Sequence, residues 1–92
     1  MTSEELKKIE ENLISPKADV RKKALHELKK LSVQNAMDLL ISALATKNDD
    51  IRADLIKAFK SFKEAPLPYL VKAFSHSSWV VREAASRVIG SL

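Results

Sequence analysis

The chain repeats one pattern three times, and this repetition is the strongest constraint on its fold. Arg21, Arg52 and Arg82 each follow a β-branched residue and lie 31 and then 30 residues apart. A period of about 30 residues is typical of stacked supersecondary units, each too small to bury its apolar face alone. The three copies are DVRKKALHELKKL (19–31), DIRADLIKAFKSF (50–62) and VVREAASRVIGSL (80–92).

Apolar residues stay in register on both sides of these arginines, in spacings that indicate two amphipathic helices per unit. Each unit is therefore predicted to be a helix, a short turn and a second helix. The upstream columns are Leu6, Met37 and Leu67, then Ile9, Leu40 and Leu70, then Leu13, Leu44 and Phe74. The downstream columns are Ala24, Leu55 and Ala85, then Leu28, Phe59 and Ile89, then Leu31, Phe62 and Leu92.

We predict an all-α fold in which three stacked helix-turn-helix repeats, about six helices, form a short α-solenoid. At 92 residues the chain is expected to be one domain over residues 1–92. The alternative is a non-repetitive helical bundle whose periodicity matches by accident. The expected repeats span about 2–32, 33–64 and 65–92, and the expected helices 3–14, 18–31, 34–46, 49–62, 66–75 and 79–91.

Capping residues mark several of these boundaries. Thr2 with Glu5 is predicted to form a capping box, and Asn48-Asp49-Asp50 to supply an N-cap for the fourth helix. The fifth helix is expected to start at Glu64-Ala65-Pro66, with Pro68 also in its first turn, where a missing N–H costs little. Hydroxyls in His76-Ser77-Ser78 are expected to cap the sixth.

The pattern Asp-(Val/Ile)-Arg-x-x-(Ala/Leu)-x-x-x-(Leu/Phe), at 19–28 and 50–59, resembles HEAT repeats, especially the short bilin-lyase-type HEAT-like repeats. The resemblance covers essentially the whole chain and implies a fold more than a function, because such repeats serve many functions. In that family Asp and Arg at the start of the repeating helix often hydrogen-bond between neighbouring repeats. This implies a structural role for Asp19, Arg21, Asp50, Arg52 and Arg82, although Val80 replaces the Asp in the third repeat.

The Lys- and Ile-rich, Cys-free sequence is also similar to the small helical accessory subunits of crenarchaeal B-family DNA polymerase holoenzymes. That similarity implies a DNA replication complex among the possible settings. It rests on no motif.

Nothing in the sequence indicates catalysis, so the chain is not expected to be an enzyme. It has no Cys, one Gly and two His that lie on different predicted helices, His26 and His76. These features remove thiolate chemistry, a glycine-rich phosphate loop and a paired-His metal site. We therefore assign no catalytic, cofactor-binding or metal-binding residue and expect no cofactor.

Two predicted helices carry almost no charge and are candidates for a protein-binding surface. QNAMDLLISALAT contains only Asp38, and APLPYLVKAFSH only Lys72. A helix that is apolar all round is usually buried, so in so thin an array part of this surface is expected to meet a larger partner subunit. The alternative is that adjacent repeats cover it. The candidate protein-binding residues are Leu39, Ala43, Pro68, Tyr69, Lys72, Ala73 and Trp79.

The C-terminal edge is a second candidate interface. Trp79 occupies a turn where the other repeats carry Ala18 or Asp49. An exposed Trp beside an unfinished stack edge would suit docking or a homodimer. The alternative is a local staple, with Trp79 folded back onto Phe74 and Val80.

A basic helix face supports the alternative function of nucleic-acid association. The net charge is +4, from 16 Lys and Arg against 12 Asp and Glu. Like charges at repeat spacing could follow the phosphates of DNA or RNA. The alternative, which the nearby acids Asp54, Glu27 and Glu83 favour, is a solvated lysine face that keeps the chain soluble. The candidate phosphate-binding residues are Lys22, His26, Lys29, Lys57, Lys60 and Arg87.

The N-terminal segment MTSEELKKIEEN is acidic and polar where a signal peptide would be basic and then apolar. No apolar run approaches the roughly 18 residues of a membrane span. We expect a cytoplasmic protein that does not bind membranes.

Overall fold

The computed structural model describes residues 2–63 and 65–92, and within them the chain forms six α-helices and no strand. Met1 and Glu64, the latter expected to begin the fifth helix, lie outside the described residues. The helices are α1 (Ser3–Leu13), α2 (Ala18–Leu28), α3 (Val33–Ala43), α4 (Asp49–Ser61), α5 (Leu67–Ala73) and α6 (Trp79–Ser91). The expected all-α architecture is confirmed, with helix ends within three residues of the predicted ones.

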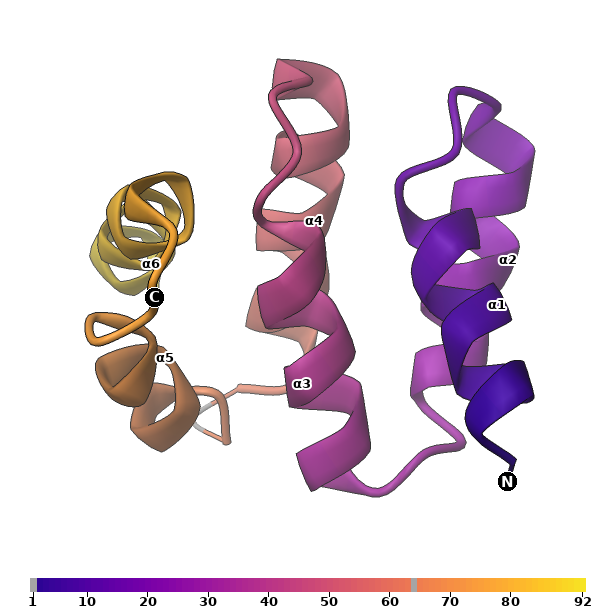
Figure 1. The fold of residues 1–92 in the computed structure, drawn as a ribbon, viewed down its shortest axis with the longest axis horizontal. Helices are drawn as coiled ribbons and strands as arrows, with labels where there is room; N and C mark the ends of the chain where they lie inside the picture. The colour runs from indigo at the N-terminus through magenta and orange to yellow at the C-terminus, as the bar shows by residue number, and fades with distance from the viewer. Residues whose placement is uncertain (1, 64) are drawn as a thin grey trace.

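The helices pair in chain order, and the pairs stack side by side (Figure 1). In this view α1 and α3 lie in front of α2 and α4, and the pair of α5 and α6 is turned relative to the first two. Helix α3 is central because it contacts α1, α4, α5 and α6. A helix with neighbours on both flanks has few positions left for solvent, and this decides the burial of several predicted site residues.

Side-chain caps begin four of the helices. The Thr2 hydroxyl accepts from the Glu5 N–H at 3.2 Å, which is one of the two bonds of the predicted capping box. Asn48 Oδ1 accepts from the Ile51 N–H at 3.1 Å, within the predicted cap at 48–50. Ser78 likewise accepts from the Val81 N–H. Ser32 caps α3, a role that the sequence reading did not assign. These caps satisfy helix N–H groups that would otherwise lack partners.

The core follows the predicted columns in the first two repeats and departs from them in the third. Met37 and Leu44 are fully buried, whereas their repeat equivalents Leu67 and Phe74 are 38% and 45% exposed. The expectation that all columns are core is therefore wrong at these two positions and at Leu92, which is also 45% exposed. The cause is that α3 packs against α1, α4, α5 and α6, whereas α5 packs mainly against α3 and α6.

Each repeated arginine hydrogen-bonds to the turn that joins the two helices of its own hairpin. The guanidinium of Arg21 donates to the Ser15 carbonyl at 2.7 Å, and that of Arg52 donates to the Thr46 carbonyl at 2.7 Å. Arg82 makes the same bond to the His76 carbonyl, again six residues earlier. Each arginine thus satisfies an otherwise unpaired carbonyl in its own inter-helix turn.

The expected ladder of Asp and Arg between repeats is largely wrong. Among the described residues one ion pair crosses between repeats, from Arg21 Nε to Asp54 Oδ2 at 3.2 Å. Asp19 and Asp50, which were expected to take part, are exposed, and neither joins a neighbouring repeat in the described contacts. In this chain the contact between repeats is made by Asp54, which lies one helical turn after Asp50 on α4.

Candidate interaction surfaces

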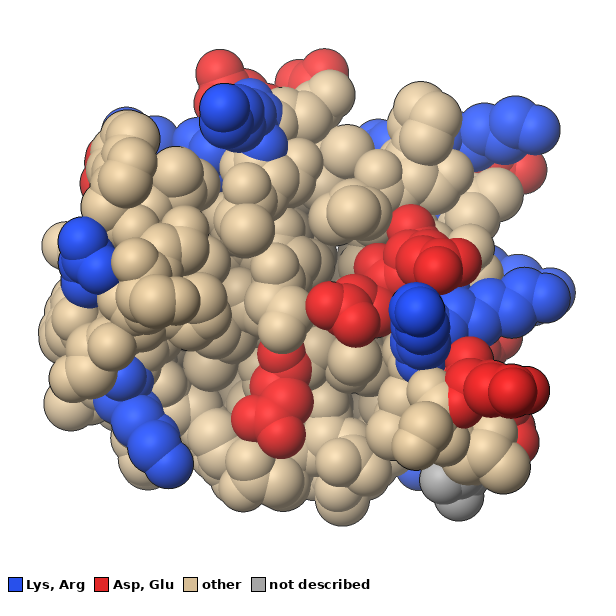
Figure 2. All heavy atoms as spheres, in the orientation of Figure 1, with Lys and Arg blue, Asp and Glu red and all other residues tan. Residues whose placement is uncertain are grey.

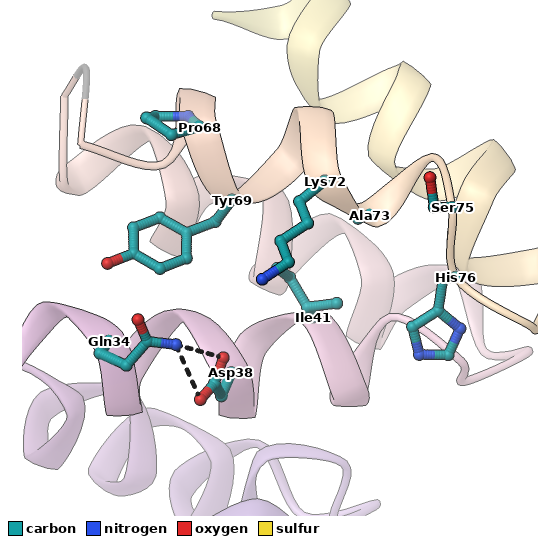
Figure 3. A pocket seen from close by; sticks show the side chains of 9 residues that line it. All are labelled: Gln34, Asp38, Ile41, Pro68, Tyr69, Lys72, Ala73, Ser75 and His76. Carbon is teal, nitrogen blue, oxygen red and sulfur yellow. Dashed lines mark hydrogen bonds between the residues drawn. The ribbon is translucent and has the colours of Figure 1, made fainter.

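A groove between α3 and α5 brings together four of the predicted protein-binding residues. It has a volume of about 460 Å³. Tyr69 and Lys72 point from α5 toward α3, and Ile41 points back from α3 (Figure 3). The residues that line the groove are Gln34, Asp38, Ile41, Pro68, Tyr69, Lys72, Ala73, Ser75 and His76.

The groove combines apolar side chains with one acidic residue, Asp38, and one basic residue, Lys72. The Asp38 carboxylate accepts two bonds from the Gln34 amide, at 3.0 and 3.1 Å. Within the described part of the chain Lys72 forms no ion pair with Asp38 or any other carboxylate. The Lys72 ammonium and the Asp38 carboxylate, which only the neutral Gln34 amide contacts among the described residues, can both orient a ligand. Such sites draw affinity from apolar contact and specificity from polar groups.

The mouth of the groove is shaped by a turn that His76 stabilises. Its Nδ1 accepts from the Ser78 N–H at 3.0 Å, and its carbonyl accepts from the Arg82 guanidinium. Because Nδ1 acts as an acceptor, the neutral ring carries its proton on Nε2. The turn therefore presents a half-buried imidazole beside Ser75 at one end of the groove.

Three of the predicted protein-binding residues are not on the surface. Leu39 is 9% exposed, Ala43 is 3% exposed, and Ala73 is 5% exposed although it lines the groove. The expectation that Leu39 and Ala43 face outward is wrong because both flanks of α3 are covered by neighbouring helices. The alternative, that adjacent repeats cover these positions, is correct for them.

The face that carries α1, α3 and α5 is otherwise unevenly charged. Figure 2 shows it as mostly uncharged over α3 and α5, with charged side chains of both signs gathered over α1. The exposed groups of α1 include Glu4, Glu5, Lys7 and Lys8. The groove therefore lies in the less charged part of this face.

Three comparisons with known proteins test which family the chain belongs to. A model of the HEAT repeats matches residues 6–90, which is nearly the whole chain. The chain belongs to the HEAT repeat family. Comparisons with curated proteins and with solved structures find no match. HEAT repeats are commonly protein-interaction modules, and the stacked helix pairs described above are those repeats.

The basic residues of this HEAT array fall around three separate hollows. Lys22, His26, Lys29 and Lys57 line a groove of about 360 Å³ between α2 and α4, together with Asp54. Four of the six predicted phosphate-binding residues are thus brought together, but the same groove holds the carboxylate of Asp54, which is paired with Arg21.

Lys29 is already engaged within the chain. Its Nζ donates to the Ser61 carbonyl at 3.2 Å and lies 4.6 Å from the centroid of the Phe62 ring. A cation held over an aromatic ring is stabilised there. Lys29 would lose these internal contacts on binding a phosphate, so it should contribute less to ligand affinity than a solvated lysine. Its role is to connect the ends of α2 and α4.

The remaining two predicted basic residues lie apart from this groove. Lys60 borders a shallow hollow with Lys63 at the ends of α4 and α6. Arg87 lies in the groove between α4 and α6 and pairs with Glu83 at 2.8 Å. The six residues therefore do not form one continuous row.

Trp79 is the most exposed large apolar side chain of the described residues, at 64%. It lines the groove between α4 and α6, and the predicted staple does not bury it, since Phe74 is also 45% exposed. Another exposed apolar stripe runs along α5 and consists of Leu67, Val71 and the C-cap residue Phe74. The C-terminal edge of this array is thus more apolar than the polar helix α1.

One wall of the α3–α5 groove was not among the predicted binding residues. Gln34, Asp38 and Ile41 lie four and then three residues apart, a spacing that places them on one helix face. That spacing was readable beforehand, but which face meets α5 depends on how the repeats stack. From the sequence, His76 was considered as a metal ligand and was not assigned to a binding surface.

Two further features are absent from the described residues. In residues 2–63 and 65–92, no group of three or more His, Asp or Glu side chains is placed to hold a metal ion. No described helix has the length and apolar character needed to cross a bilayer.

Proposed function

We propose that this HEAT array is a non-catalytic interaction module that holds a segment of a larger protein in the groove between α3 and α5. The observation that carries the proposal is the convergence there of Tyr69, Ile41 and the two unpaired charges of Asp38 and Lys72. Tyr is enriched at interface hot spots because it combines a large contact area with a polar tip. A volume of about 460 Å³ suits a few anchoring side chains.

The test is a comparative affinity purification from native extract, with nuclease treatment and a high-salt wash. The wild-type chain is compared with Lys72→Glu and Tyr69→Ala, both in the groove, and with Lys17→Glu. Lys17→Glu is a matched charge reversal at an exposed position in the turn between α1 and α2. All variants are first shown to keep their helical circular dichroism and cooperative unfolding.

We expect one stoichiometric partner to survive nuclease and salt with the wild type and Lys17→Glu, and to be lost with both groove variants. A partner that binds Lys72→Glu and Tyr69→Ala as well as the wild type would remove the groove from the proposal. A partner released by nuclease would favour the second function below.

A second candidate function is contact with nucleic-acid phosphates through the α2–α4 groove. It is supported by the clustering of Lys22, His26 and Lys57 around one hollow. With so few available cations, duplex binding should weaken with salt at a slope of about −2 to −3 in log Kobs against log salt. A gel shift that Lys22→Ala and Lys57→Ala do not affect would refute it.

Three earlier predictions remain predictions. Membership of the HEAT family does not select a DNA replication complex, a cytoplasmic location or a homodimer through the C-terminal edge. The exposed stripe on α5 is the surface on which a homodimer would be sought, by measuring whether Val71→Asp changes the sedimentation of the purified chain.

A further inference from the structure

Two equivalent arginines, Arg21 and Arg52, differ in their carboxylate contacts. Both donate to a carbonyl six residues earlier at 2.7 Å. Arg21 also uses Nε, which donates to Asp54 Oδ2 at 3.2 Å across the boundary between the first and second repeats. Its side chain is 10% exposed, so the guanidinium is desolvated and matched by a carboxylate.

At the next boundary the carboxylate is missing. The residue 30 positions after Asp54 is Ala84, which lines the groove between α4 and α6 together with Arg52. Arg52 donates to the Thr46 carbonyl and, at 3.2 Å, to Asp49, whose side chain is 91% exposed. Its Nε is buried and has no hydrogen-bond partner among the described residues. A buried donor of this kind is costly, and native structures usually satisfy it.

The groove around Arg52 has the charge and shape for an acidic side chain. Its volume is about 250 Å³. Besides Arg52 it is lined by Lys47 and Arg87, and its one acid, Glu83, is already paired with Arg87 at 2.8 Å. The unpaired charge in the groove is therefore positive.

The same groove offers an apolar wall. Trp79, Val80 and Ala84 line it, and Trp79 is 64% exposed. A cation beside an exposed indole is a combination that recognises an acidic residue next to an apolar one in a peptide.

We propose that the α4–α6 groove binds an acidic protein segment, with an Asp or Glu carboxylate on the Arg52 guanidinium and an adjacent apolar side chain against Trp79. The bound carboxylate occupies the place that Asp54 takes at the first repeat boundary. A protein carboxylate fits better than a nucleic-acid backbone, which needs a row of available cations. Among the described residues Arg52 pairs with the exposed Asp49 and Arg87 pairs with Glu83, so Lys47 is the one cation of this groove outside an ion pair.

This inference shares the protein-binding function proposed above but concerns a different groove. Arg52 Nε is covered in the unbound chain, so a carboxylate reaches it only when a side chain of the groove shifts. Trp79 is the largest side chain of the groove, and it is also the single Trp of the sequence. Its fluorescence therefore reports this groove and not the α3–α5 groove.

The experiment is a fluorescence titration of the full chain with an acetylated, amidated peptide of alternating Asp and Leu. The comparison ligands are the same peptide with Asn for Asp, inorganic phosphate, and a single-stranded oligonucleotide. We expect saturable binding of the Asp peptide, and at least tenfold weaker binding of the Asn peptide. Equal binding of the Asp and Asn peptides, or stronger binding of phosphate or the oligonucleotide, would overturn the assignment of a protein carboxylate.

The decisive variant is Ala84→Asp, which places an internal carboxylate where Asp54 stands in the first groove. It should weaken the Asp peptide at least tenfold and raise the melting temperature. Ser86→Asp makes the same charge change at an exposed position of α6 outside the groove, and should bind within about threefold of wild type. If Ala84→Asp folds and binds as tightly as the wild type, the proposal fails.

If Ala84→Asp does not fold, Lys47→Glu provides a second test of the same groove. Lys47 is exposed and precedes α4, so its reversal should leave the fold intact and weaken the Asp peptide at least threefold. Unchanged binding by Lys47→Glu would count against the groove. Lys72→Glu, in the α3–α5 groove, should leave the Trp79 fluorescence response to the Asp peptide unchanged. The peptide titration therefore tests the α4–α6 groove alone, and the affinity purification tests the α3–α5 groove.

Discussion

Replacing Leu39 by Ala tests whether α3 is buried on both flanks. Leu39 is 9% exposed and belongs to the continuous apolar core. The substitution removes three carbon atoms, about 2.4 kcal/mol at roughly 0.8 kcal/mol per buried methylene. A partly collapsed cavity adds about 1 kcal/mol, and the better helix propensity of Ala returns a few tenths. We expect Leu39→Ala to lower the free energy of unfolding by about 2.5–4 kcal/mol.

The assay is urea unfolding followed by circular dichroism, with thermal unfolding beside it. For a chain of this size the loss corresponds to a fall in melting temperature on the order of 10–30 °C. Phe59→Ala, at a fully buried position of α4, should cost about 3–5 kcal/mol. Val71→Ala, at a position 58% exposed on α5, should change stability by no more than about 0.5 kcal/mol.

A small effect at Leu39 would refute the argument. If Leu39→Ala costs less than about 1 kcal/mol while Phe59→Ala costs the expected amount, Leu39 is not held between helices. The first expectation from the sequence, that Leu39 faces a partner, would then regain support. A loss close to that of Phe59→Ala would place α3 firmly inside the stack.

Two further predictions concern stability. Gly90→Ala should stabilise the chain by about 0.5 kcal/mol, because an added Cβ meets nothing within 4 Å and Ala is the better helix former; a destabilised variant in urea unfolding would contradict this. A double-mutant cycle of Arg21→Met and Asp54→Asn should give a coupling of about 1 kcal/mol, reduced by the 38% exposure of Asp54 and weakened by salt. A coupling near zero at low salt would mean that this contact does not join the repeats.

The sequence predicted the elements well because the signals for them are local. The spacing of Arg21, Arg52 and Arg82 gave the repeat, and Asn48 and Ser78 marked helix starts that the structure confirms. The fifth helix is shorter than expected, since it begins at Leu67 after Pro66 and ends at Ala73.

The surfaces were harder to predict because exposure depends on neighbours in the stack. Leu39 and Tyr69 are repeat equivalents, yet Leu39 is buried and Tyr69 lines a groove, because α3 is central and α5 is not. The unpartnered Nε of Arg52 could not be read from the sequence either. It requires knowing that Asp54 meets Arg21 in space, and then that Ala84 takes its place one repeat later.

The arginine bonds within each hairpin also bear on how the chain folds. A link that spans six residues closes a small loop, so its entropic cost is modest and is met within one hairpin. We expect the three hairpins to form early and locally and then to associate, which is the behaviour of topologies dominated by near-neighbour contacts. The slow step of folding would then be the docking of preformed hairpins on α3, where substitutions at fully buried Met37 and Leu40 should retard refolding most.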